Sequence, residues 1–126
     1  MRDLKNNIGV DASISPSGNR NASVNGTGSD LKGFEGAVAV FQPGTITDGT
    51  HTPKVQESDD NSSFTDVAAA DQLGTLAALA ANTVQRVGYI GSKRYIRAVV
   101  TVAGATTGGQ YSAAIIKGVS ASRPVA

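Results

Sequence analysis

The chain has 126 residues, enough for one domain but too few for two ordinary ones. It has 15 Gly, 5% aromatic residues and no Cys, a composition that favours short strands and tight turns and excludes disulfides and thiolate metal sites. The formal net charge is +1, and no stretch approaches the roughly 18 apolar residues of a membrane span, so neither nucleic acid nor a membrane is an expected partner.

Residues 1–30 are predicted to form an extended N-terminal arm. Ser, Asn, Gly and Asp dominate 11–30, and Pro-Ser-Gly-Asn at 16–19 predicts a turn. Such a segment buries too little apolar surface to fold alone, so we expect it to be disordered or ordered by a partner. No apolar segment follows 1–7, and we therefore expect no signal peptide and synthesis in a cytoplasm. The arm residues expected to contact the partner are Arg2, Leu4, Ile8, Val10 and Ile14.

A strand-rich domain is predicted over 31–126. Apolar and other residues alternate with period 2 over 34–40, which predicts a half-buried strand that ends at Pro43-Gly44. Asp48-Gly49 is typical of a hairpin turn, and a short strand follows over 51–57. A polar loop at 58–63 then precedes an extended segment at 64–67.

The segment 67–81 leaves two structures open. Leu73, Leu76 and Leu79 recur at roughly helical spacing among many alanines, which favours a short helix. Gly74 and β-branched Thr75 lie in the middle and weaken that prediction. An irregular crossover is the alternative.

The last third predicts strands at 85–90, 95–102 and 111–119. Gly91-Ser92 predicts a turn after the first, and the Gly/Thr-rich stretch 104–109 predicts an antiparallel hairpin between the other two. Several short strands in a chain of this length indicate an all-β fold. We expect a single antiparallel β-sandwich, jelly-roll or Ig-like, or a barrel, with the N-terminal arm extended from it.

No arrangement of residues predicts catalysis or a bound cofactor. His51, the only histidine, lies between threonines in a predicted hairpin and is interpreted as a surface turn residue. Glu57, Asp59 and Asp60 are interpreted as a solvated loop, and their spacing does not match a calcium loop. The glycines of 88–93 do not have the order of a phosphate-binding loop. We therefore expect a non-enzymatic protein without metal or cofactor.

Two runs carry a resemblance to a known group of proteins. The runs ESDDNSSFTDV at 57–67 and RVGYIGSKRYIRAVVTV at 86–102, with DGTHT at 48–52, resemble a family of small tailed-bacteriophage proteins encoded near the capsid gene. The likeness covers about 31–120. It implies a virion protein of the capsid cement, or decoration, type that binds the major capsid protein on the outer capsid surface.

The resemblance leaves other virion roles open. A cement protein is expected to be a homo-oligomer, with a trimer as the first expectation because such proteins often occupy symmetry axes. The alternatives are a tail, connector or fibre-base component, and a carbohydrate-binding surface module that uses calcium through Asp59 and Asp60.

Overall fold

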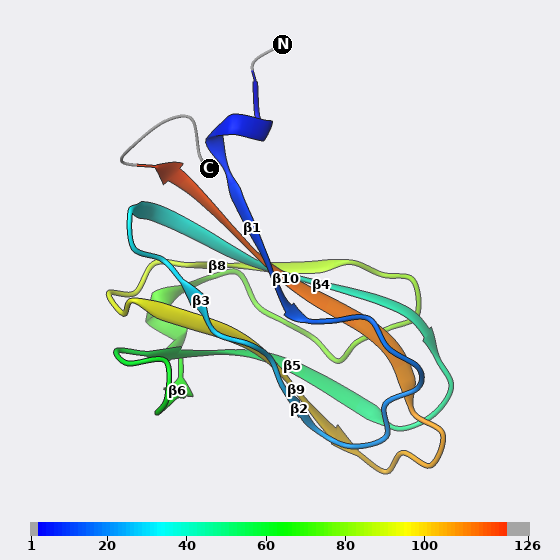
Figure 1. Ribbon diagram of the computed structural model, residues 1–126. Coiled ribbons are helices and arrows are strands. Elements are labelled where there is room, and N and C mark those ends of the chain that lie inside the picture. Colours follow the sequence, from blue (N-terminus) through cyan, green and yellow to red (C-terminus); the bar gives the residue numbers. More distant parts are fainter. Residues whose placement is uncertain (1–2, 121–126) are drawn as a thin grey trace.

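The computed structural model describes residues 3–120, which form two antiparallel sheets packed face to face (Figure 1). The predicted β-sandwich is confirmed, and the sheets do not close into a barrel. Two short 3-10 turns, η1 (Lys5–Asn7) and η2 (Ala69–Asp71), accompany the strands. The strands are β1 (Gly9–Ile14), β2 (Val24–Asn25), β3 (Ser29–Asp30), β4 (Phe34–Ile46), β5 (Thr50–Ser58), β6 (Thr65–Asp66), β7 (Gln72–Leu73), β8 (Gln85–Tyr89), β9 (Tyr95–Ala103) and β10 (Gly109–Ser120).

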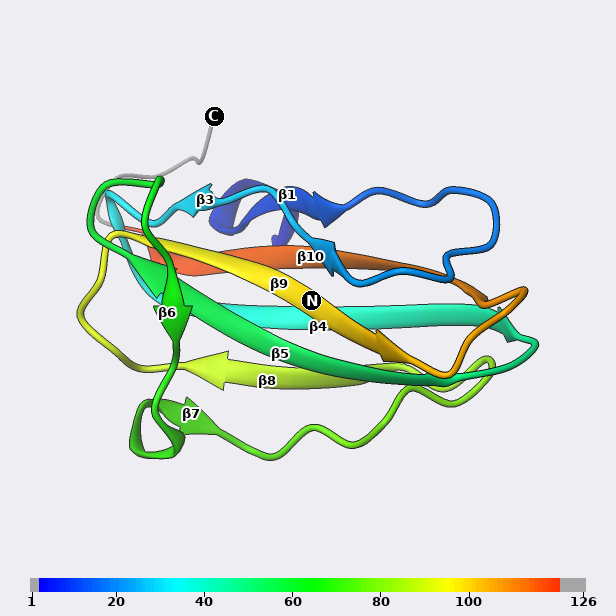
Figure 2. The same ribbon diagram turned by 90° about the horizontal axis from the view of Figure 1, so that it is seen from below.

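The strand order identifies the jelly-roll form of the sandwich. Sheet A has the order β1-β10-β4-β8-β7, and sheet B has the order β2-β9-β5-β6, with β3 also paired to β9 (Figure 2). The pairs β1–β10, β2–β9, β4–β8 and β5–β6 are nested, as in one long hairpin rolled into two sheets. This arrangement is a jelly roll. It excludes the Ig-like alternative, in which the sheets have different strand orders.

The long strands β4, β5, β8, β9 and β10 alternate between the two sheets along the chain. Both predicted hairpins are therefore wrong: Asp48-Gly49 carries the chain from sheet A to sheet B, and residues 104–108 carry it back. β5 pairs along its length with β9, and β10 pairs with β4. Alternation along a strand shows which side chains share a face, but it does not show which strand lies alongside.

The core lies between the sheets and consists mainly of small and β-branched side chains. Phe41 and Ile115 from sheet A and Ile96 and Val100 from sheet B are fully buried in it. Each belongs to a run in which every second residue points inward, as strand geometry requires.

The prediction that residues 1–30 form an arm separate from the sandwich is wrong for 9–30, because this segment contributes three strands. β1 pairs with β10 from Gly9 to Ile14, while β2 and β3 both pair with β9. Ile14 is 2% exposed and belongs to the core. The backbone N–H of Gly26 also donates to the carbonyl of Ala98 at 2.7 Å. The segment has few apolar side chains, but its backbone groups find partners in both sheets, which composition does not reveal.

Residues 67–81 form the irregular crossover rather than an α-helix. Gly74 has a φ of +103° directly after β7, a conformation that interrupts regular structure. The amide of Gln85 then holds the next segment extended: its Oε1 accepts from the N–H of Ala77 at 2.8 Å, and its Nε2 donates to the carbonyl of Ala77 at 3.1 Å. Leu79 is buried in the core, Leu76 packs at its edge and Leu73 is exposed, so the leucine spacing corresponds to no common buried face.

Candidate interaction surface

The outer face of sheet A, here called the A face, is covered by apolar side chains. One row across the sheet runs Val10, Ile116, Val38, Gly88 and Leu73, and the next runs Ala12, Ala114, Val40 and Arg86. Arg86, on β8, is the one charged residue in these two rows. Arg86 and the polar pair Ser112 and Gln42 border the apolar part of this face, which is formed by Ile8, Val10, Ala12, Gly36, Val38, Val40, Leu73, Gly88, Ala114, Ile116 and Gly118.

These side chains remain accessible in the monomer. Val10 and Leu73 are each 60% exposed, and Val38, Val40 and Ile116 are half-buried. At strand spacings of about 4.8 Å and rises of about 3.3 Å per residue, the four main strands give the A face a footprint of roughly 400 Å². The largest apolar patch on a typical monomer has about this size and is often functional.

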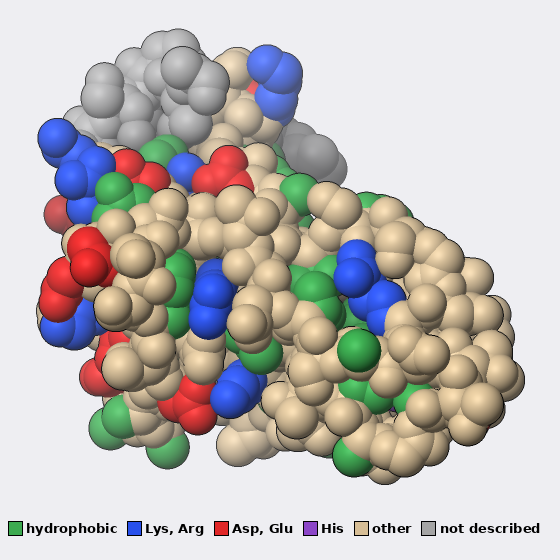
Figure 3. All heavy atoms as spheres, turned by 60° about the horizontal axis from the view of Figure 1, so that its bottom comes forward, with side chains coloured by type: hydrophobic (Ala, Val, Ile, Leu, Met, Phe, Trp, Pro, Cys, Tyr) green, Lys and Arg blue, Asp and Glu red, His purple; other side chains and the backbone are tan. Residues whose placement is uncertain are grey.

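The outer face of sheet B is polar by contrast. Lys54 forms a salt bridge with Asp66 at 3.1 Å, and Gln56 accepts two hydrogen bonds from Arg97. The Arg97 guanidinium also lies 4.1 Å from the centre of the Phe64 ring. Figure 3 shows this side of the molecule, where charged side chains gather toward the left end. Sheet B therefore has an ordinary solvated face, whereas sheet A does not.

The structure separates the five predicted partner-binding residues. Val10 points outward on the A face, and the side chain of Ile8 lies beside Gly118 on that face. Leu4 is 66% exposed and immediately precedes η1, while Arg2 lies outside the described residues. The prediction for Ile14 is wrong because the side chain is buried in the core, where no partner reaches it.

The sequence analysis missed most of the A face because it placed the partner site in the supposed arm. The runs 36–41 and 113–116 are apolar or glycine at every position, although the sandwich core accounts for only every second residue. A strand that is apolar on both sides is typical of a sheet covered on both faces. That pattern was the available indication of a second packing surface.

His51 is a core residue, and its interpretation as a surface histidine is wrong. The side chain is 1% exposed, because His51, Pro53 and Val55 alternate inward along β5. Its Nε2 lies 3.0 Å from the carbonyl oxygen of Asp48, which only accepts, so Nε2 carries the proton and donates. Its Nδ1 lies 3.2 Å from the hydroxyl of Tyr111, so both ring nitrogens have a partner. Burial raises the pKa of Tyr111.

The Asp48 carboxylate links the β4–β5 connection, in which it lies, to the β9–β10 connection at the same end of the sandwich. It accepts backbone N–H bonds from Thr106, Thr107 and Gly108, the last at 2.6 Å. The bond from Gly108, followed by that from Thr107, lowers the pKa of Asp48. Three successive amides around one carboxylate form an anion-binding nest, filled here by the protein's own side chain.

Replacing Asp48 with Asn is expected to lower the free energy of unfolding at pH 7, since the neutral amide accepts fewer of these bonds. The folded pKa of Asp48 is depressed, so its contribution is present above the unfolded pKa of about 3.9 and is lost as the pH falls through the folded value. The difference in the free energy of unfolding between wild type and the Asp48→Asn variant should therefore become smaller below about pH 4. Urea midpoints at pH 7 and pH 3 test this, with Glu35→Gln at an exposed carboxylate as control, and a difference in unfolding free energy that is independent of pH would contradict it.

The acids at the end of β5 and in the loop after it engage their carboxylates separately, and Glu57 lies in the strand rather than in the predicted loop. Asp60 accepts from the backbone N–H groups of Ser62 and Ser63 at 2.9 Å, and Asp59 pairs with Lys93 at 2.8 Å. Glu57 accepts from the hydroxyl of Tyr89 at 2.8 Å. Over residues 3–120, no group of three or more His, Cys, Asp or Glu side chains is placed to hold a metal ion. The loop geometry therefore gives no support to calcium-dependent carbohydrate binding through Asp59 and Asp60.

Comparison with known proteins places the chain in a family. No curated protein and no solved structure matches it. Within residues 3–120 there is also no helix long and apolar enough to cross a lipid bilayer. The model of the Bbp16 family, whose name is phage-related, matches residues 17–115, which is most of the chain and runs from the segment before β2 into β10. The chain therefore belongs to the Bbp16 family and is a phage-associated protein.

Proposed function

We propose that this protein is a non-enzymatic capsid cement protein that binds the outer surface of a phage capsid and stabilises contacts between major capsid proteins. The observation that carries the proposal is the apolar A face on a rigid jelly roll from a phage-related family. A cement protein needs a broad docking surface rather than an enclosed active site. The A face has that character, and it lies on one side of the molecule with the solvated face of sheet B on the other.

The size of the A face sets a limit on how it works. Its footprint of roughly 400 Å² is about half of the roughly 800 Å² per partner in a standard stable interface. One copy docked by this face alone would bind weakly. We therefore propose that the protein acts as a homo-oligomer, with a trimer as the first expectation, so that several weak contacts combine.

The copy number of the protein in purified virions tests the proposal. Quantitative mass spectrometry should find it in near-equal number to the major capsid protein. A handful of copies per particle would instead assign it to a tail, connector or fibre base. Absence from virions would remove the virion role altogether.

Replacing Ala114 with Glu tests whether the A face is the docking surface. Ala114 lies between Ala12 and Val40 on the A face, so docking would bury an unpaired charge. Burying an unpaired charge costs about 3 kcal/mol or more. Binding to capsids that lack the protein should therefore weaken by more than about 100-fold. Cosedimentation with such capsids measures this.

Thr101→Glu is the matched control, since Thr101 is exposed on the outer face of sheet B. It should bind as wild type does. Equal binding of Ala114→Glu and Thr101→Glu would show that the capsid docks elsewhere. If Ala114→Glu turns an oligomer into a monomer that still binds capsids, the A face is the contact between copies of the chain.

A further inference from the structure

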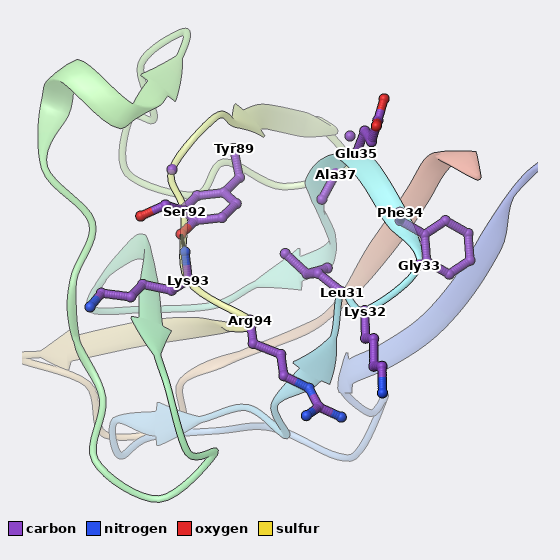
Figure 4. A pocket seen from close by; sticks show the side chains of 12 residues that line it. Leu31, Lys32, Gly33, Phe34, Glu35, Ala37, Tyr89, Ser92, Lys93 and Arg94 are labelled. Carbon is purple, nitrogen blue, oxygen red and sulfur yellow. Dashed lines mark hydrogen bonds between the residues drawn. The ribbon is translucent and has the colours of Figure 1, made fainter. Parts of the chain in front are cut away.

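A second feature suited to binding lies at one end of the sandwich. Strand β8 leaves sheet A after Tyr89, and the chain crosses to sheet B, where β9 begins at Tyr95. Because β8 ends there, the first residues of β4 have no strand beside them on that side: the β4–β8 pairing stops at Ala37. The space left is a pocket of about 480 Å³ between the start of β4 and the β8–β9 turn (Figure 4). Pockets that bind ligands commonly measure 300–1,000 Å³.

The interior of this pocket is apolar. Leu31, Ala37 and Tyr89 point into it in Figure 4, and the first two pack against the edge of the hydrophobic core. The hydroxyl of Tyr89 is already engaged, since it donates to Glu57 at 2.8 Å and accepts from the backbone N–H of Lys93 at 2.9 Å. Burial raises the pKa of Tyr89 to about 12, so the ring stays neutral. The pocket therefore offers carbon surface to an occupant.

The rim of the pocket is mainly cationic. Lys32, Lys93 and Arg94 line it together with a single acid, Glu35, and their charged ends extend outward in Figure 4. Asp30 holds Arg94 through two hydrogen bonds of 2.9 and 2.8 Å, and Asp59 holds Lys93, as described above. Neither of these acids lines the pocket, so the two cations are fixed at the opening without closing it.

We propose that this pocket takes an acidic, extended segment of the major capsid protein that inserts one bulky apolar side chain. The apolar interior fits the side chain, and Lys32, together with the ammonium of Lys93 and the guanidinium of Arg94 that Asp59 and Asp30 hold at the opening, can receive neighbouring carboxylates. Gly36 both lines the pocket and belongs to the A face, so a partner docked on that face reaches the pocket around one edge of β4. This inference rests on the proposed cement function, and it supplies the contact that the A face alone lacks.

Site-specific photo-crosslinking in virions tests the assignment. The photoreactive residue p-benzoylphenylalanine replaces Ser92, which is exposed and lines the pocket, and in a control chain it replaces Asn19, which is exposed on the loop before β2. Irradiation should link the Ser92 variant to the major capsid protein and leave the Asn19 variant unlinked. Links from Ser92 to another copy of this chain, or none at all on virions that carry the protein in full number, would overturn the proposal.

Reversing one rim charge gives a second measurement. Lys32→Glu should weaken binding to capsids lacking the protein by about 5- to 10-fold, because like charges would then meet at the rim. Asn19→Glu, which adds a negative charge away from the pocket, should change binding less than 2-fold. Unchanged binding of Lys32→Glu would count against the pocket while leaving the cement function in place, whereas absence of the wild-type protein from virions would remove both.

Discussion

Replacing Gly108 with Ala is expected to lower the free energy of unfolding by about 3 to 5 kcal/mol. Gly108 has a φ of +89°, a conformation that is strained for a residue with a Cβ. A Cβ at this position would also overlap the carbonyl oxygen of Arg20. That oxygen accepts from the N–H of Gly109 at 3.1 Å, so the loop before β2 would have to move away from β10.

Two other glycines separate these effects. Gly104 has a φ of +67° with open space around it, so Gly104→Ala should cost only the backbone strain, about 1 kcal/mol. Gly18 has open space and no positive φ, and Gly18→Ala should be close to neutral. Urea denaturation of the three variants measures the differences. Equal losses for Gly108→Ala and Gly104→Ala would show that the contact with Arg20 does not matter.

Replacing Ile14 with Ala is expected to cost about 2 to 5 kcal/mol, the usual range for truncating a buried isoleucine. Ile14 is 2% exposed and packs in the core although it belongs to the Ser- and Asn-rich N-terminal segment. Val10, four residues earlier on the same strand, is 60% exposed, and Val10→Ala should change stability by less than about 0.5 kcal/mol. Thermal and urea unfolding of both variants measure the contrast.

The two outcomes for Ile14 have opposite meanings for the fold. A large loss confirms that residues 9–30 are part of the jelly roll and fold with it. A loss as small as that of Val10→Ala would mean that the segment is held loosely against a sandwich that is stable without it. Capsid binding should respond in the opposite way, because Val10 lies on the A face and Ile14 does not.

Part of the interaction surface could have been predicted from the sequence. Val38 and Val40 lie on one face of a predicted strand, and Ala39 and Phe41 lie on the other, which faces the core. Both faces of that strand are therefore apolar. What could not be predicted is that Ala12, Ala114 and Val40 form one row, because this depends on β1 and β4 both pairing with β10. The pocket depends likewise on where β8 ends beside β4.

His51 and Asp48 illustrate the same limit at the opposite end of the molecule. Both lie near Gly49 in a stretch whose composition is typical of an exposed turn. Their partners, Tyr111 and residues 106–108, are about sixty positions away along the chain. A turn that connects two sheets packs against other connections, whereas a turn within a hairpin faces solvent. Local sequence does not distinguish these two cases.

The amino-acid sequence by itself determined that this protein is all-β and approximately where its long strands from 34 onward lie, because alternation and turn residues act over a few neighbouring positions. The predicted end at Pro43-Gly44 is wrong, since β4 continues to Ile46. Only the tertiary structure decided the jelly-roll order, the place of residues 9–30 in both sheets and the burial of His51 and Ile14. It also decided that the apolar residues of three distant strands form one face. These features depend on pairing between segments far apart in the chain, and the period-2 pattern of a strand is the same whichever partner it takes.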